Sequence, residues 1–244
     1  MKTGLPSTRR LAALALLLIV NLASGPAAAA DAAATAKRVF TMSGFQQISL
    51  EGPYSLHVRV GRGVSVRAEG DRDALDAAYV AVQGDRLVIR QNRSGWSARD
   101  TDGPISFEVS VPALTAVRVA GSGSMTVDGV KASRFTGTLL GTGRLAISGA
   151  TVDMATISAS GSGSISIAGT AGAARLAVQG ASDIDASAFA VRTLDAAMQG
   201  AGTIKAQASE SARVVLAGAG DVEIAGDARC SVTRSGSGRV TCGR

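Results

Sequence analysis

Apolar and polar positions alternate through the C-terminal half of the chain, and triplets of small residues interrupt the alternation at regular intervals. The residues four and six places after the start of each triplet are apolar or sulfur-containing, and the residue two places before it is apolar except at Arg234. Period-two alternation on both sides of a tight turn indicates two strands joined at a corner. The seven triplets are Gly121-Ser122-Gly123, Gly141-Thr142-Gly143, Gly161-Ser162-Gly163, Gly180-Ala181-Ser182, Gly200-Ala201-Gly202, Gly218-Ala219-Gly220 and Gly236-Ser237-Gly238.

Successive triplets begin 20, 20, 19, 20, 18 and 18 residues apart. A fixed period of about 20 residues with one tight turn per repeat is typical of a parallel β-solenoid, in which each repeat forms one coil. Glycine suits such corners because the neighbouring coils lie about 4.8 Å above and below, which leaves little room for a Cβ atom. The pattern predicts an all-β fold, a parallel β-helix or β-solenoid, with seven regular repeats over residues 113–244.

Two other interpretations of the repeats fit less well. Calcium-binding β-rolls repeat about every nine residues with aspartates at fixed places. Here the residue three places after each triplet start varies, and examples are Ser124, Arg144 and Asp183. Disordered low-complexity segments lack the apolar residues that offset the entropy of ordering. The apolar positions of the seven repeats therefore argue against disorder.

Residues 40–112 contain alternating segments with less regular spacing. We interpret them as irregular first rungs that cap the solenoid, so that residues 40–244 form a single domain. Residues 71–78 predict a short helix with Asp73 as its N-cap, and Gly84-Asp85 predicts the turn of a hairpin. The predicted strands lie around residues 48–50, 56–60, 64–66, 80–82, 87–89 and 105–111, the last ended by Pro112.

The first 30 residues predict a secretory signal peptide. Basic residues precede the apolar run 11–20, and small residues around Ala30 provide a cleavage site before Asp31. This run is shorter than the roughly 20 residues that a membrane-spanning helix needs, so we expect no span after cleavage. Residues 31–39 are rich in alanine and predict a flexible tail. We therefore expect the protein in the periplasm, or secreted to the cell surface.

The segment 91–104 is the most polar loop of the chain and contains the single tryptophan, Trp96, between Arg93 and Arg99. Tryptophan and arginine are enriched at interaction hot spots, so this loop could anchor a partner. Alternatively, Trp96 folds back and closes the end of the solenoid, because a large apolar side chain favours burial. An aspartate pair in the loop resembles the start of a calcium site, but the later ligands are missing and we predict no metal.

Cys230 and Cys242 are the only cysteines, six residues on either side of Gly236. A reversal at that glycine would place them level on opposing segments of the last coil, and export would favour oxidation. We therefore predict a disulfide between them. The alternative is two buried thiols that fill core positions.

Catalytic side chains are scarce. The only histidine, His57, falls on the polar side of a predicted strand, where we expect a solvated position. Histidine clusters typical of zinc sites are missing, and we predict neither catalytic residues nor a cofactor. Asp183 and Asp185 flank an inward-facing residue and are expected to point outward. Outward carboxylates on a β-solenoid leave a polysaccharide lyase or hydrolase as the enzymatic alternative.

Charge and aromatic content restrict the partners. Without residues 1–30 the chain has 22 basic and 19 acidic residues, scattered along its length. This distribution and the predicted export argue against nucleic acid as a partner. Aromatic residues are 3% of the chain, so stacking against sugar rings is disfavoured. A flat β surface with Thr, Ser, Arg and Asp suits weak multivalent contact with an envelope polymer or a surface protein.

The glycine triplets, residues 45–48 followed by Gly52-Pro53-Tyr54, and Pro112-Ala113-Leu114 after a strand resemble the bacterial family of putative autotransporter adhesins with a head GIN domain. The resemblance covers about residues 40–244. It implies a pectin-lyase-like β-helix without that superfamily's catalytic residues, exported from the cell, with a role in adhesion. We therefore expect a non-enzymatic envelope protein that binds through the solenoid surface or the 91–104 loop. A polysaccharide-acting enzyme and a purely structural envelope protein are the alternatives.

Overall fold

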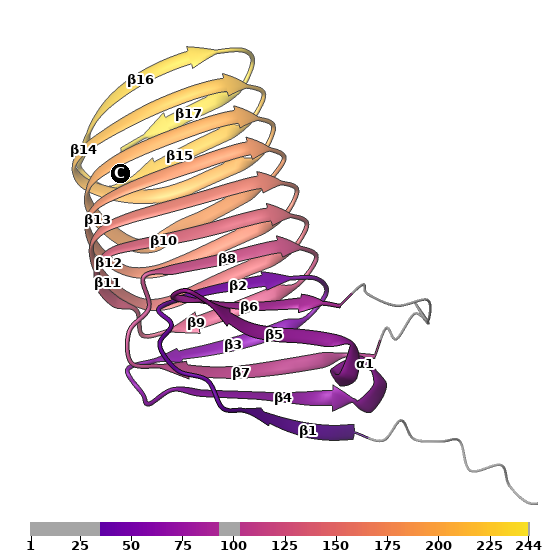
Figure 1. Cartoon of the computed structure of the whole chain (residues 1–244). Helices are drawn as coiled ribbons and strands as arrows, with labels where there is room; N and C mark the ends of the chain where they lie inside the picture. Colours follow the sequence, from indigo (N-terminus) through magenta and orange to yellow (C-terminus); the bar gives the residue numbers. More distant parts are fainter. Residues whose placement is uncertain (1–34, 93–102, 244) are drawn as a thin grey trace, which may run out of the picture. The chain divides into compact units, whose positions relative to one another are not determined.

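The computed structural model describes residues 35–92 and 103–243. These residues form a 17-stranded sheet that winds into a solenoid and one short helix (Figure 1), which confirms the predicted all-β fold. The elements are β1 (Thr35–Phe40), β2 (Gln47–Glu51), β3 (Ser55–Val60), β4 (Ser65–Asp71), α1 (Arg72–Ala77), β5 (Ala78–Gln83), β6 (Arg86–Gln91), β7 (Ile105–Val111), β8 (Ala116–Gly121), β9 (Ser124–Asp128), β10 (Lys131–Gly141), β11 (Arg144–Gly161), β12 (Ser164–Gly180), β13 (Asp183–Gly200), β14 (Thr203–Gly218), β15 (Asp221–Ala225), β16 (Arg229–Ser235) and β17 (Arg239–Cys242).

From β8 onward, each strand pairs in parallel with the strand one coil later, and the first glycines of successive triplets are aligned. Gly121 pairs with Gly141, and the column continues through Gly161, Gly180, Gly200 and Gly218. The solenoid has about six turns. The seventh predicted triplet lies between β16 and β17, which form the last coil of the described part of the chain.

The interior consists of columns of apolar side chains that run from coil to coil. Ile165 pairs with Leu145 on one side and with Ile184 on the other, and all three are at most 1% exposed. Phe135 and Phe189, which the triplet period does not identify, are also fully buried. Each coil buries its apolar side chains against its neighbours, so the stability of a coil depends on the coils beside it.

The N-terminal coils are stacked in an order that differs from their order along the chain. β2 and β3 pair in parallel with β8 and β9 on one side, and with β6 and β7 on the other. The coil of residues 47–60 therefore lies between two coils that follow it in sequence. Its corner is Gly52, which has a φ of +131° and donates its N–H to Ala120 O at 3.0 Å. The column of corner glycines thus begins one coil before the first triplet.

Antiparallel strands cover the N-terminal end of the solenoid. β4 pairs with β7, and β1 pairs with β4. The predicted hairpin is present as β5 and β6, which are antiparallel. Residues 35–39 are predicted as part of a flexible tail, but they lie in β1, and its pairing with β4 overturns that prediction for these residues.

The short helix α1 is present, but its predicted N-cap is wrong. Asp71 is the N-cap, because its side chain accepts a hydrogen bond from the N–H of Ala74 at 3.0 Å. Asp73 lies within the first turn, where its charge favours the helix dipole. With six residues, α1 is far from the roughly 20 that cross a bilayer, and the described residues contain no candidate membrane-spanning helix.

Cys230 and Cys242 form the predicted disulfide, and their Cα atoms are 6.4 Å apart. Cys230 lies on β16, which pairs with β14, and Cys242 lies on β17, which pairs with β15. Both side chains pack against the apolar core. The disulfide therefore joins the two strands of the last coil across its interior.

Reduction of this disulfide is expected to lower the free energy of unfolding by roughly 2–3 kcal/mol, because the bond restricts the unfolded chain. Urea unfolding with and without reductant measures the loss, and hydrogen exchange should locate it in β16 and β17. The double variant Cys230→Ser, Cys242→Ser should have the same free energy of unfolding as the reduced protein, and reductant should not change it. Equal stability of the oxidised and reduced forms would contradict the prediction.

Ser182 has a fully buried side chain whose Oγ has no hydrogen-bond partner among the described residues. A buried hydroxyl without a partner costs about 1–3 kcal/mol. Ser182→Ala is therefore expected to raise the free energy of unfolding by about 1 kcal/mol, measured by urea unfolding. Ser162→Ala, at an exposed triplet position, is the control and should change little. A less stable Ser182→Ala protein would mean that the hydroxyl has a partner in solution.

Candidate functional site

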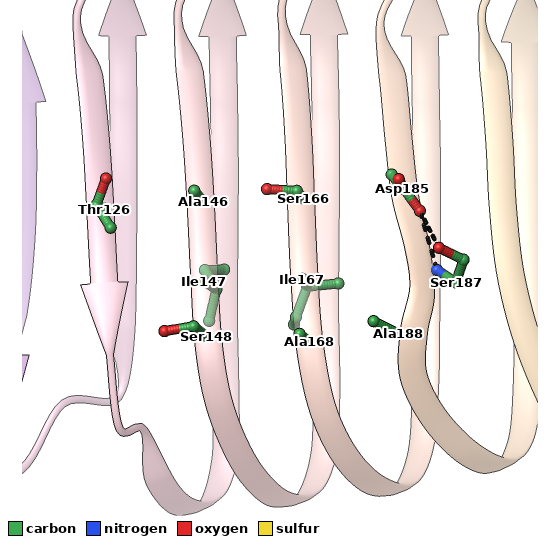
Figure 2. Close-up of a pocket in the computed structure, with 10 residues that line it drawn as sticks. All are labelled: Thr126, Ala146, Ile147, Ser148, Ser166, Ile167, Ala168, Asp185, Ser187 and Ala188. Atoms are coloured by element: carbon green, nitrogen blue, oxygen red, sulfur yellow. Dashed lines mark hydrogen bonds between the residues drawn. The ribbon is translucent and has the colours of Figure 1, made fainter.

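The strands that follow the glycine corners form one outer surface, which we call the leading face. It consists of the outward side chains of β3, β9, β15 and β17 and of the first residues of β11 to β14. Because side chains alternate along a strand, outward residues of successive coils form rows across this face. One such row runs over four coils (Figure 2) and contains Thr126, Ala146, Ser166 and Asp185.

An open hollow of about 230 Å³ lies along this row. Figure 2 shows its lining, which consists mainly of small hydroxyl and methyl side chains with one carboxylate, Asp185. Asp185 Oδ1 accepts hydrogen bonds from the backbone N–H of Ser187 at 3.1 Å and from its hydroxyl at 2.6 Å. These bonds, with a smaller effect of Lys205, hold the pKa of Asp185 below its usual value. The carboxylate is therefore ionised at neutral pH.

A polar network lies beside the hollow at the N-terminal end of the leading face. His57 Nε2 is 2.6 Å from Asp128 Oδ2, and the hydroxyl of Ser148 donates to Asp128 Oδ1. On the other side of the histidine, Arg59 Nη2 is 3.4 Å from His57 Nδ1 and 3.8 Å from Glu108 Oε1. His57 lies on the polar side of its strand, as expected, and its side chain is partly exposed. Both of its ring nitrogens also have partners, which the sequence did not predict.

The network does not have the geometry of an activated serine. In a Ser-His-Asp triad the histidine lies between the other two groups and takes the proton of the serine. Here Asp128 lies between His57 and Ser148, so the serine hydroxyl donates to a carboxylate and not to the imidazole. The described residues also contain no group of three or more His, Cys, Asp or Glu that could hold a metal ion. The network therefore joins side chains of three successive coils, on β3, β9 and β11.

Asp183 and Asp185 both point outward, as expected. Asp183 Oδ1 accepts a hydrogen bond from the backbone N–H of Thr203 at 2.9 Å, so this carboxylate joins two successive coils. The predicted loop residues Arg93, Trp96 and Arg99 lie outside the described residues.

Sequence reasoning identified His57 and missed Asp128. The two residues are 71 positions apart, and only the parallel register of β3 with β9 brings their strands together. The sequence signal that could have found the pair is the position of Asp128 at the end of a strand that follows a glycine corner.

Asp128 gives a pH-dependent contribution to stability. Its pKa lies below the usual 3.8, chiefly because of the hydrogen bond with His57 and then that with Ser148. When the pKa of a carboxyl group is lower in the folded than in the unfolded protein, its ionised form stabilises the fold. This contribution is fully present at a pH above the unfolded-state pKa, and it is lost as the pH falls through the folded-state pKa. Asp128→Asn should therefore lower the free energy of unfolding at pH 7 and have little effect near pH 2. Because the pair is partly exposed, the loss should be roughly 0.2–1 kcal/mol.

Urea unfolding of four proteins checks this prediction: the wild type, Asp128→Asn, His57→Ala and the double variant. If the contact carries the effect, the two single changes are not additive and the double variant loses no more than either one. Full additivity, or an Asp128→Asn effect that grows at low pH, would show that the contact with His57 does not cause it.

A family model described as putative auto-transporter adhesin, head GIN domain, matches residues 44–228. A putative adhesin from Bacteroides fragilis NCTC 9343 is 20% identical, with a TM-score of 0.76 over 86% of this chain and 97% of that one. A putative lipid binding protein from Parabacteroides distasonis ATCC 8503 is 18% identical, with a TM-score of 0.67 over 86% and 96% of the two chains.

A third solved structure, a putative adhesin from Parabacteroides merdae ATCC 43184, is 16% identical, with a TM-score of 0.65 over 86% of this chain and 96% of that one. At these identities the solved structures show a shared fold, which does not by itself give a function. Comparison with curated proteins finds no match. Because the family model spans most of the chain, the protein belongs to the family of putative auto-transporter adhesins with a head GIN domain.

Proposed function

We propose that this protein is an exported, non-enzymatic component of the cell envelope that binds a polymer or another protein in an adhesion-like role. Its family and the relatives described as putative adhesins support the general role. The N-terminal segment supports export, to the periplasm or to the cell surface.

The observation that carries the proposal is the repeated polar surface of the leading face. Hydroxyl and charged side chains recur on successive coils, which lie about 4.8 Å apart. An extended ligand that lies across the coils would meet similar groups several times, and repeated weak contacts add up to useful avidity. The hollow is smaller than the roughly 300–1,000 Å³ of typical small-molecule pockets, so it suits a segment of a polymer better than a whole ligand.

The described aromatic side chains support contact through polar groups. Tyr54, Phe45, Phe107, Phe135 and Phe189 are all buried, so none of them provides an exposed platform for stacking against sugar rings. Phe40 on β1 and Tyr79 on β5 are partly exposed, but neither strand belongs to the leading face. Recognition on the leading face would therefore depend on hydrogen bonds and charge.

Binding of the full chain, after signal removal, to cell-wall and outer-membrane fractions tests the proposal. Ser166→Arg would place a long charged side chain in the hollow, and we expect at least a tenfold loss of binding with an unchanged melting temperature. Ser158→Arg is the matched control, because Ser158 lies near the end of β11, before a glycine corner and so outside the leading face, between Thr138 and Ala177 in its row. Equal binding by both variants would exclude the leading face.

The same assay separates the alternatives. Trp96→Ala should abolish binding at an unchanged melting temperature if the 91–104 loop is the anchor, and should lower the melting temperature if Trp96 closes the solenoid. Binding to neither fraction would favour a purely structural protein. Turnover of a polysaccharide that His57→Ala or Asp183→Asn abolishes in a folded protein would show that the protein is an enzyme.

A further inference from the structure

The last coil differs in charge from the rest of the chain. Residues 229–244 contain four arginines and no acidic residue, whereas residues 31–228 contain 18 basic and 19 acidic residues. Arg229, Arg234 and Arg239 are exposed. The net positive charge that remains without the signal peptide is therefore concentrated at one end of the solenoid.

Arg234 also ends the apolar interior. In the register of β14 and β16 it pairs with Leu216, so it occupies a position that is apolar in every earlier repeat. Its Nη1 donates to Gly238 O at 3.1 Å, which holds the side chain at the end of the coil. Val232, which pairs with the buried Val214, is 45% exposed. An arginine at a position that is otherwise apolar and inward-facing disfavours the stacking of a further coil of the same kind.

The last coil presents main-chain groups that have no strand beside them in the described part of the chain. β16 pairs only with β14, and β17 only with β15. The N–H of Arg239 donates to Gly220 O. Because successive residues of a strand direct their main-chain groups to opposite sides, the N–H and C=O of Val240 face away from β15. The disulfide holds this edge in place, so it is a preformed template for an added strand.

A second copy of the chain does not suit this edge. Two last coils placed end to end would bring two sets of arginines together, and like charges at close range repel. The opposite end of a second copy begins with the antiparallel strands β1 and β4, so it offers no parallel coil of the same kind to stack. An acidic segment of another protein is complementary both to the charge and to the free edge.

We propose that the last coil, residues 229–242, docks an extended acidic segment of another polypeptide. The segment adds a strand beside β17 through main-chain hydrogen bonds, and its carboxylates contact Arg229, Arg234 and Arg239. The arginines select the charge of the partner, and the edge selects an extended peptide backbone. This edge is separate from the leading face, so the proposal does not depend on envelope binding by that face.

A fluorescent peptide of alternating Glu and Val, titrated with the full chain and followed by anisotropy, tests the proposal. We expect this peptide to bind, and we expect at least tenfold weaker binding of its Lys-Val analogue and of a Glu-Val peptide with methylated backbone nitrogens. Arg239→Glu should weaken binding at least tenfold, whereas Arg213→Glu on β14, whose edges are both paired, should not. Val240→Pro should weaken binding more than Val240→Ala, because both variants lose the valine side chain that packs against the core but only proline also removes an outward N–H.

Several results would overturn the proposal. Equal binding of the methylated and unmethylated peptides, or stronger binding of polygalacturonate than of the Glu-Val peptide, would show that the coil is a site for anionic polymers. An absence of peptide binding, with self-association of an Arg234→Ser, Arg239→Ser variant, would show that the arginines serve only to protect the edge. The methylated peptide needs no variant, so it decides the question even if Val240→Pro fails to fold.

Discussion

Replacing Ile165 with aspartate is expected to unfold much of the solenoid. The side chain is 1% exposed and lies in a column between Leu145 and Ile184, where no partner for a carboxylate is present among the aligned residues. An unpaired charge in such a site costs several kcal/mol. Typical domains are stable by only about 5–15 kcal/mol, so one substitution removes a large part of the total. Because coils stabilise one another, the loss should spread to both sides.

Circular dichroism during thermal unfolding measures this effect, and Ser164→Asp is the matched control. Ser164 precedes Ile165 on β12 and points outward, next to Arg144, whose Nε donates to its hydroxyl at 3.4 Å. The same new charge there should change the melting temperature by only a few degrees. If Ile165→Asp melts as the control does, the interior column is not what holds the coils together.

The regular coils could be predicted because the same pattern of apolar positions and glycine corners occurs in each repeat. The triplets identify the corners, and the alternating positions around them identify the inward columns, of which Ile165 is one member. The stacking of the first coils could not be predicted in this way. Residues 47–60 alternate like any strand pair, and alternation does not show which strands are neighbours or whether they run parallel. Only the structure places this coil between later ones.

In the candidate site, too, contacts within one coil could be predicted from the sequence, whereas contacts between coils that are distant in sequence could not. Cys230 and Cys242 could be paired from sequence because both fall in one coil around a single corner. The contact of His57 with Asp128 joins two coils whose adjacency has no signal in the spacing of their residues. The helix N-cap shows a limit of local patterns, because Asp71 and Asp73 are both reasonable capping residues and the choice depends on where the preceding strand ends.

The corner glycines should be the positions least tolerant of a methyl group, and Gly200→Ala is expected to lower the free energy of unfolding by roughly 3 kcal/mol or more. Two effects combine at this position. Its φ is +136°, which L side chains rarely adopt and which costs about 1–3 kcal/mol. A Cβ there would also lie 2.0 Å from Gly180 O on the neighbouring coil, so the backbone of one coil would have to move.

Three further glycine variants separate these two effects. Gly202 has no positive φ, but a Cβ there would lie 1.9 Å from Ser182 O, so Gly202→Ala reports the contact between coils alone. Gly61 has a φ of +92° with open space around it, so Gly61→Ala reports backbone strain alone, whereas Gly63, with open space and no positive φ, should accept alanine with little change. Urea unfolding should rank the losses with Gly200→Ala largest and Gly63→Ala near zero. If Gly202→Ala is as stable as Gly63→Ala, the close approach of coils at the corners does not require glycine, and the glycine triplets recur along the chain only for their turn geometry.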